Sequence, residues 1–141
     1  MFITHQSSGL PHGFDNRATS LRLVGAADNW QEDRLTLYFS EYFSDGEEIV
    51  LGNSPQLEHE DAAASLIVTG CQPWTIFQTE TYQGDAICVF PGSELSCTPG
   101  FYPNARSLSS LGYSVSSVRK GCFAKTKIYP PTEMNENKLI N

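Results

Sequence analysis

The chain has 141 residues, of which 40% are apolar and 18% charged, and its formal net charge is −7. This length suits one domain with a substantial core, and no apolar run approaches the roughly 18 residues that a membrane-spanning helix needs. Residues 1–70 carry eleven acidic and three basic side chains, and because such a surface repels phosphate backbones, nucleic acid is excluded as a partner.

A short sequence motif occurs three times along the chain and predicts three strands. Residues 1–13 precede it and are interpreted as an arm. Each copy has a small polar residue, a β-prone run and a glycine stop, and the copies are Ser20–Gly25, Ser65–Gly70 and Ser117–Gly121. A tryptophan and a second β-prone run follow the first two copies. The repeated order indicates a fold built from similar units.

Two predicted hairpins share an aromatic residue that is closely followed by a glycine. The earlier one reads Phe43-Ser44-Asp45-Gly46 and the later one Tyr82-Gln83-Gly84, with a β-prone run on each side. A glycine there allows a positive φ, and the aromatic ring can cover the folded hairpin. The acidic residues of the earlier hairpin are interpreted as a solvated face, the alternative being a cation or partner surface; they are Glu41, Asp45, Glu47 and Glu48.

Strands with this spacing and no clear helical period predict paired Greek keys in a β-sandwich. Residues 58–64 are the one helical candidate, and they form a short turn at most because Ser65 opens the next strand. Residues 124–141 contain Pro130 and Pro131 and then a polar run, which predicts a flexible tail.

The cysteines are four in number and lie in the second half, at positions 71, 88, 97 and 122. No Cys-x-x-Cys pair and no histidine at zinc-ligand spacing accompanies them, so two disulfides are the simplest interpretation. Three pairings are possible, and Cys88–Cys97 would close a short local loop. Disulfides form in oxidising compartments, so the chain is expected to be secreted or lumenal.

The hairpins and the strands after them resemble the Greek keys of βγ-crystallins. That family has an aromatic residue, a second aromatic residue after four others, a glycine two positions further, and some thirty residues later a serine that opens a Val/Leu-rich strand. The later copy matches closely with Phe77, Tyr82, Gly84 and Ser117. The earlier copy matches, with one residue of slippage before the glycine, through Tyr38 or Phe39, Phe43, Gly46 and Ser65.

This resemblance implies an all-β fold in which two Greek-key motifs form a βγ-crystallin-type sandwich, with an extra N-terminal strand. The expected domain is residues 14–123, divided into a partial key at 14–30, key one at 35–70 and key two at 71–122. About the implied twofold axis Cys71 and Cys122 are symmetry mates, which favours the disulfides Cys71–Cys122 and Cys88–Cys97. A homodimer or protein-partner contact is expected at the partial key.

Some members of this family bind calcium through an [Asn/Asp]-[Asn/Asp]-x-x-[Ser/Thr]-Ser motif, and residues 15–20 fit all six positions. Carboxylate, amide, hydroxyl and main-chain oxygens are the donors that Ca²⁺ prefers. The ligands implied for this motif are Asp15, Asn16, Arg17 through its carbonyl, and Thr19. The alternative is an Asx-type turn that leads into a strand.

The two later copies of the motif are incomplete. Residues 60–65 keep Glu60 and Asp61 but have Ala64 at the hydroxyl position, whereas residues 112–117 keep Ser116 and lack the acids. Because sites of this family borrow ligands from two motifs, Ser116 and the Ser114 carbonyl with Glu60 or Asp61 are expected to form one degraded Ca²⁺ site.

These features predict a secreted βγ-crystallin-like structural or calcium-binding module and no enzyme. The histidines are His5, His12 and His59, all outside predicted strands, and the cysteines are assigned to disulfides, so the spacing singles out no nucleophile and base. The alternative function is a protein-, glycan- or membrane-binding subunit of a defence or toxin-like complex, which would use the partial key and the acidic first half as contact surfaces.

Overall fold

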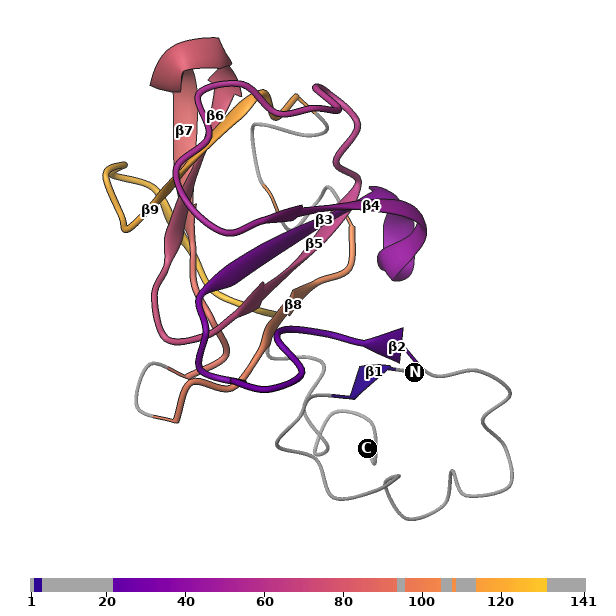
Figure 1. Cartoon of the computed structure of the whole chain (residues 1–141). Coiled ribbons are helices and arrows are strands. Elements are labelled where there is room, and N and C mark those ends of the chain that lie inside the picture. Colours follow the sequence, from indigo (N-terminus) through magenta and orange to yellow (C-terminus); the bar gives the residue numbers. More distant parts are fainter. Residues whose placement is uncertain (1, 4–21, 94–95, 105–107, 109–113, 132–141) are drawn as a thin grey trace.

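Two four-stranded sheets pack into a β-sandwich in this computed structural model, which describes residues 2–3, 22–93, 96–104, 108 and 114–131 (Figure 1). The first sheet has the order β4-β3-β5-β8, with β3 (Arg34–Ser40), β4 (Ser44–Val50), β5 (Ser65–Thr69) and β8 (Gly100–Tyr102). The second has the order β10-β7-β6-β9, with β6 (Trp74–Thr79), β7 (Gln83–Val89), β9 (Ser117–Lys120) and β10 (Lys127–Ile128). The short 3₁₀ turns η1 (Glu41–Phe43) and η2 (Glu80–Tyr82) join β3 to β4 and β6 to β7. The predicted all-β Greek-key sandwich is confirmed.

Each key contributes to the sheet of the other key. β8 comes from the second key and pairs with β5 of the first. In return, Ser54 of the first key forms an antiparallel bridge with Val118 in β9 of the second. These contacts join the two keys, because each key forms hydrogen bonds with an edge of the other key's sheet.

The core lies between the sheets and follows the period-2 alternation of the strands. In β3 and β6, every second side chain is buried against the opposite sheet, as for Leu35, Leu37, Trp74 and Ile76. Burial of such a side chain stabilises the fold by roughly 1.5–3 kcal/mol. In the described part of the chain, no helix is long and apolar enough to cross a membrane.

The expected extra N-terminal strand is β2 (Arg22–Leu23). It pairs in parallel with β1 (Phe2–Ile3), which lies within the predicted arm, and the two form a separate two-stranded sheet. The extra strand therefore pairs with neither of the four-stranded sheets. The rest of the arm and of the partial key, residues 4–21, lies outside the described residues.

The prediction of a flexible tail from residue 124 is wrong for its first part. β10 pairs in parallel with β7, and Ile128 packs against the core. The buried Tyr102 hydroxyl accepts the Phe90 amide hydrogen at 2.9 Å and lies 2.8 Å from the Ile128 carbonyl oxygen, to which it can donate. A two-residue strand leaves almost no sequence pattern, and this one is held by tertiary contacts. Residues 132–141 lie outside the described residues.

The predicted disulfide pairing is also wrong. The structure joins Cys71 to Cys97 and Cys88 to Cys122, in place of Cys71–Cys122 and Cys88–Cys97. The direction of the Cys88 side chain explains the difference. Cys88 stands opposite Thr75 in the sheet, and both side chains face outward, where residues 121–124 cross over them. Cys122 is thereby placed beside Cys88, and closure of a short loop does not decide the pairing.

The two β-hairpins fold over at η1 and η2 with left-handed backbone at consecutive non-glycine residues. Tyr42 and Phe43 have φ of 57° and 60°, and Thr81 and Tyr82 have φ of 55° and 60°. Such conformations cost on the order of 1–2 kcal/mol per residue. Edge-on contacts of Phe43 with Tyr38 and of Tyr82 with Phe77, with ring centroids 5.7 and 5.6 Å apart, offset part of this cost.

A buried serine holds each folded hairpin. Ser65 Oγ accepts the Phe43 amide hydrogen at 3.0 Å and donates to the Ser40 carbonyl at 2.7 Å. Ser117 Oγ accepts the Tyr82 amide hydrogen at 3.0 Å and donates to the Thr79 carbonyl at 2.6 Å. The two serines, which also open the repeated sequence motif, are thus equivalent parts of the two keys.

In the first key the glycine comes one residue later than the family pattern requires, and Asp45 takes the position of that glycine. Gly84 has φ of 79°, and its equivalent in the first key is Asp45, with φ of 66°. Gly46 is needed for another reason, because a Cβ there would lie 2.7 Å from atoms of the Phe39 ring. Asp is among the few residues that tolerate left-handed backbone, so the first key keeps the turn without its glycine.

Replacement of Ser117 with alanine is expected to lower the free energy of unfolding by about 1–3 kcal/mol, because the Tyr82 amide and the Thr79 carbonyl lose a buried partner. The control is Ser44→Ala, which removes an exposed hydrogen bond to the Glu41 carbonyl and should change stability by no more than about 0.5 kcal/mol. Urea unfolding measures both variants. Equal effects of the two substitutions would contradict the role assigned to Ser117.

Mass spectrometry of an unreduced digest tests the disulfide pairing. Peptides that contain Cys71 and Cys97 should be joined, and so should those that contain Cys88 and Cys122. Replacement of both Cys88 and Cys122 with alanine should cost about 2–4 kcal/mol of stability. A linked peptide pair carrying Cys88 and Cys97 would refute this pairing.

Candidate functional site

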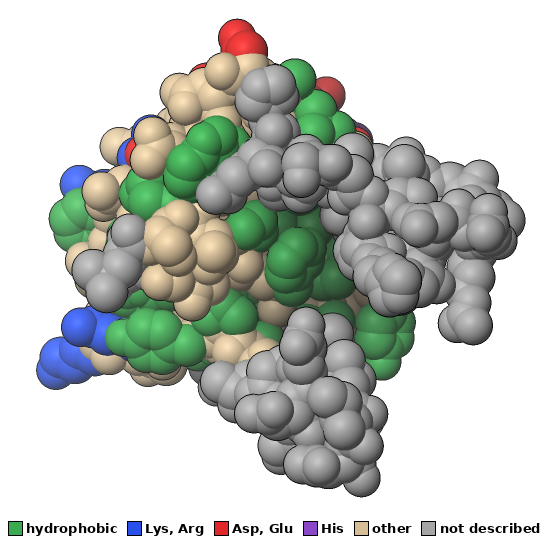
Figure 2. Space-filling model, turned by 90° about the horizontal axis from the view of Figure 1, so that it is seen from below, with side chains coloured by type: hydrophobic (Ala, Val, Ile, Leu, Met, Phe, Trp, Pro, Cys, Tyr) green, Lys and Arg blue, Asp and Glu red, His purple; other side chains and the backbone are tan. Residues whose placement is uncertain are grey.

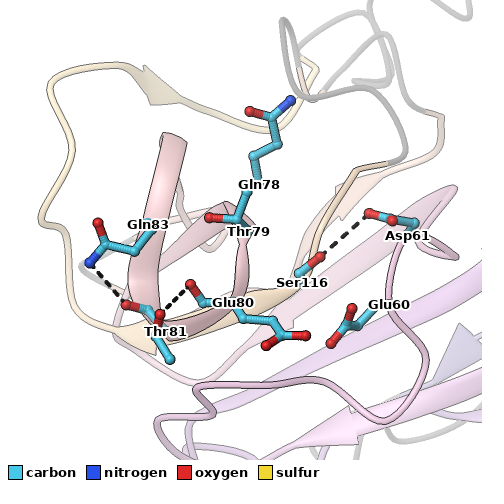
Figure 3. A pocket seen from close by; sticks show the side chains of 8 residues that line it. All are labelled: Glu60, Asp61, Gln78, Thr79, Glu80, Thr81, Gln83 and Ser116. Carbon is cyan, nitrogen blue, oxygen red and sulfur yellow. Dashed lines mark hydrogen bonds between the residues drawn. The ribbon is translucent and has the colours of Figure 1, made fainter.

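A polar cavity of about 500 Å³ opens where the two keys meet (Figure 3). Its walls come from the end of β6, from η2, from the start of β7, from the turn before β5 and from the segment before β9. The described residues that line it are Glu60, Asp61, Gln78, Thr79, Glu80, Thr81, Gln83 and Ser116. All of these side chains are polar and none is basic, so oxygen atoms dominate the chemistry of the cavity.

The two incomplete motifs of the sequence meet in this cavity, as predicted for Glu60, Asp61 and Ser116. Ser116 Oγ donates to Asp61 Oδ1 at 3.4 Å, and the Asp61 amide donates to the Val115 carbonyl at 3.0 Å. Asp61 has a left-handed backbone with φ of 57°, which directs the turn before β5 toward the second key. Ser114 is half-buried and does not line the cavity.

Two acidic side chains crowd each other in the cavity. The Glu60 and Glu80 carboxyl groups point toward one another (Figure 3). Glu60 raises the pKa of Glu80, first through a side-chain hydrogen bond and then through its negative charge. A hydrogen bond between two carboxyl groups requires a proton on one of them, so the pair resists double ionisation. The Oε1 atom of Glu60 is buried and accepts no hydrogen bond from the described residues.

Glu80 was missed by sequence reasoning, because it belongs to no calcium-type motif. Glu80 is the first residue of η2, and the folded hairpin of the second key turns it toward Glu60. Within the described residues, no group of three or more His, Cys, Asp or Glu is arranged to hold a metal ion. A cation in this cavity would therefore need hydroxyl and main-chain oxygens besides the carboxylates.

The equivalent position in the other key is less polar. The Thr81 amide donates to the Pro55 carbonyl at 2.8 Å, and the Tyr42 amide donates to Pro103 at 2.7 Å in the same way. Ser116 and Ala64 are likewise equivalent, since their amides donate to Phe77 and Tyr38. Ala64 carries no hydroxyl, so this half lacks the donor that Ser116 supplies.

Four of the other predicted site residues cannot be placed relative to this cavity. Asp15, Asn16, Arg17 and Thr19 lie outside the described residues, as do His5 and His12. His59 faces Glu48 instead, with its ring Nδ1 3.3 Å from Glu48 Oε1. Glu48 also accepts the amide hydrogens of Glu58 and His59, both at 2.9 Å, so this carboxylate braces the turn that leads to Glu60.

Solved structures of other proteins share this fold. They include a beta gamma crystallin from Ciona intestinalis (23% identity, TM-score 0.52, 62% of this chain and 98% of that chain) and a betagamma-crystallin from an archaeon (19%, 0.53, 62% and 96%). The fifth crystallin domain of the non-lens protein Absent in melanoma 1 is another (16%, 0.51, 63% and 87%). No protein-family model matches the chain, and the comparison with curated proteins found no match. The chain thus has the βγ-crystallin fold, and the predicted resemblance is confirmed at the level of the fold.

Replacement of Glu80 with glutamine should raise the melting temperature at pH 7 in the presence of EDTA. A raised carboxyl pKa means that the folded state holds the proton more tightly than the unfolded state, so stability falls as the pH rises through this range. The difference between Glu80→Gln and the parent should shrink toward about pH 3, where the Glu80 carboxyl group is protonated in the folded and unfolded states alike. Thermal melts across this pH range measure it. A lower melting temperature of Glu80→Gln at pH 7 would contradict the crowding of the pair.

Proposed function

We propose that this chain is a structural module of the βγ-crystallin fold whose stability is linked to Ca²⁺ bound in the cavity of Glu60, Asp61, Glu80 and Ser116. The observation that carries the proposal is the meeting of Ser116 and Asp61, 3.4 Å apart, beside a pair of carboxyl groups that resist ionising together. A divalent cation would neutralise this crowding, and its preferred donors are the carboxylate, hydroxyl and carbonyl oxygens of which the cavity is made.

Such a cation would act as a clamp between the keys. Glu60 and Asp61 precede the last strand of the first key, whereas Glu80 and Ser116 belong to the second key. The buried Glu60 Oε1 has no hydrogen-bond partner among the described residues. This supports the fit, because a buried carboxylate oxygen without a partner is costly and a bound cation would relieve that cost. These four residues would hold oxygen atoms from both keys around one cation.

We further propose a secreted location and no catalytic activity. The two disulfides support the location, because such bonds persist in oxidising compartments. With all four cysteines in disulfides and His59 turned toward Glu48, the described part of the chain offers no nucleophile with a base beside it. The fold of the solved structures named above fits a structural role.

Calcium is expected to stabilise the protein in a melting experiment. At a free concentration 100 times the dissociation constant, the gain is about 2.7 kcal/mol. Glu80→Gln should lose most of this gain. The matched control is Glu41→Gln, which changes the equivalent residue of η1 in the other key and should keep the gain. Differential scanning calorimetry in EDTA and in millimolar CaCl₂ measures these shifts.

The proposal fails if the parent protein melts at the same temperature in EDTA and in millimolar Ca²⁺. It also fails if Glu41→Gln and Glu80→Gln lose the gain equally, because the cation would then bind elsewhere. Isothermal titration at pH 7 provides the second readout, with about one Ca²⁺ per chain expected from the single polar half.

A further inference from the structure

A short segment crosses the outer face of the second sheet; we name residues 121–127 the strap. Thr75 Oγ1 donates to the Gly121 carbonyl at 2.7 Å and accepts the Phe123 amide hydrogen at 2.8 Å. The Cys88–Cys122 disulfide is the second attachment. Under the strap Thr75 and Cys88 have no solvent exposure. The backbone of the strap is thus fixed to the sheet.

The strap and the end of β9 together present three cations and an exposed aromatic ring. The Arg119 guanidinium lies 4.1 Å from the centroid of the Phe123 ring and 5.6 Å from that of Tyr82. Phe123 is 58% exposed, and Lys125 and Lys127 are exposed. Within the described residues, Arg119 and these two lysines have no acidic partner. Lys and Arg side chains beside hydrophobic ones are visible at the left edge of Figure 2.

The geometry of Arg119 suits a carboxylate. A guanidinium that stacks on aromatic rings keeps its N–H groups free at the edge, where they can hold a carboxylate in a bidentate manner. The aromatic contacts also limit the rotamers of this side chain, which lowers the entropy lost on binding. The surface of Arg119, Phe123, Lys125 and Lys127 therefore favours a partner with clustered carboxylates and an apolar side chain.

The chain itself carries a surface of that kind; we name residues 41–51 the acidic hairpin. Its exposed acids include Glu41, Asp45 and Glu47, and among the described residues Asp45 and Glu47 form no ion pair with a lysine or arginine. Apolar side chains accompany them, because Tyr42 is 67%, Ile49 49% and Leu51 55% exposed. β4 is moreover the edge strand of its sheet.

The two surfaces lie on different sides of the sandwich and do not meet within one molecule. β4 is at the right of Figure 1, whereas β9 and the strap after it are at the left. We propose that the strap of one copy receives the acidic hairpin of a second copy. The contact is head-to-tail, so each copy keeps one surface free, and association continues into short chains of copies.

The net charge of the molecule favours a second copy, and not an extended polyanion, as the partner of the strap. With a net charge of −7, the molecule repels a highly charged polymer or an anionic membrane outside the strap. The acidic hairpin is compact and brings its own apolar side chains. Because exposed ion pairs contribute at most about 1 kcal/mol each, the association is weak and sensitive to salt.

Sedimentation equilibrium in EDTA, which separates this test from the calcium proposal, measures the association. The average mass of the parent protein should rise with concentration at about 20 mM salt and fall to that of the monomer at about 500 mM salt, where the Debye length is much shorter. The strap variant Lys125→Glu/Lys127→Glu should remain monomeric. The hairpin variant Glu41→Lys/Glu47→Lys should also remain monomeric.

An equimolar mixture of the two variants tests whether the strap and the acidic hairpin bind each other. Each variant carries one sign of charge on both surfaces, so the mixture should associate again while neither variant does so alone. Circular dichroism melts confirm that both variants fold. A parent protein that stays monomeric at low salt and millimolar concentration overturns the proposal. Failure of the mixture to associate also overturns it, as does a monomer whose strap binds heparin or phosphatidylserine vesicles.

Discussion

The structure depends on two buried hydroxyl groups. Ser65 and Ser117 each accept an amide hydrogen from the aromatic residue of a folded hairpin and donate to a carbonyl at the end of the preceding strand. These bonds hold consecutive left-handed residues that would otherwise be strained. The candidate site inherits its geometry from this arrangement, because the fold of η2 that Ser117 fixes is what places Glu80 opposite Glu60.

The two faces of the second sheet are covered in different ways. On the inner face Trp74 and Ile76 join the core, whereas on the outer face Thr75 and Cys88 are covered by the strap. A threonine in a sheet usually faces solvent, but this one serves as a donor and an acceptor for a crossing segment. The disulfide therefore fastens an outer layer to the sandwich, and this layer carries the exposed Phe123.

Local patterns in the sequence predicted the keys, because the alternation of side chains, the spacing of the aromatic residues and the serine that opens the last strand of each key can all be read from neighbouring residues. These local patterns could not predict which residues distant in the sequence meet in the folded protein. The disulfide partner of Cys88 depends on which face its side chain takes, and one residue of register reverses it. The glycine of the first key was assigned to Gly46 because Asp45 gives no sign that it accepts a positive φ. Glu80 joins the site through the hairpin fold alone, and β10 is too short to show a pattern.

Native-state hydrogen exchange at the Phe43 and Tyr82 amides tests the central role of the serines most directly. If Ser65 and Ser117 hold the folded hairpins, both amides should exchange only through global unfolding, although they lie in tight turns near the surface. In Ser117→Ala the Tyr82 amide alone should lose this protection. Exchange of both amides at the rate of exposed turn residues in the unchanged protein would contradict the account.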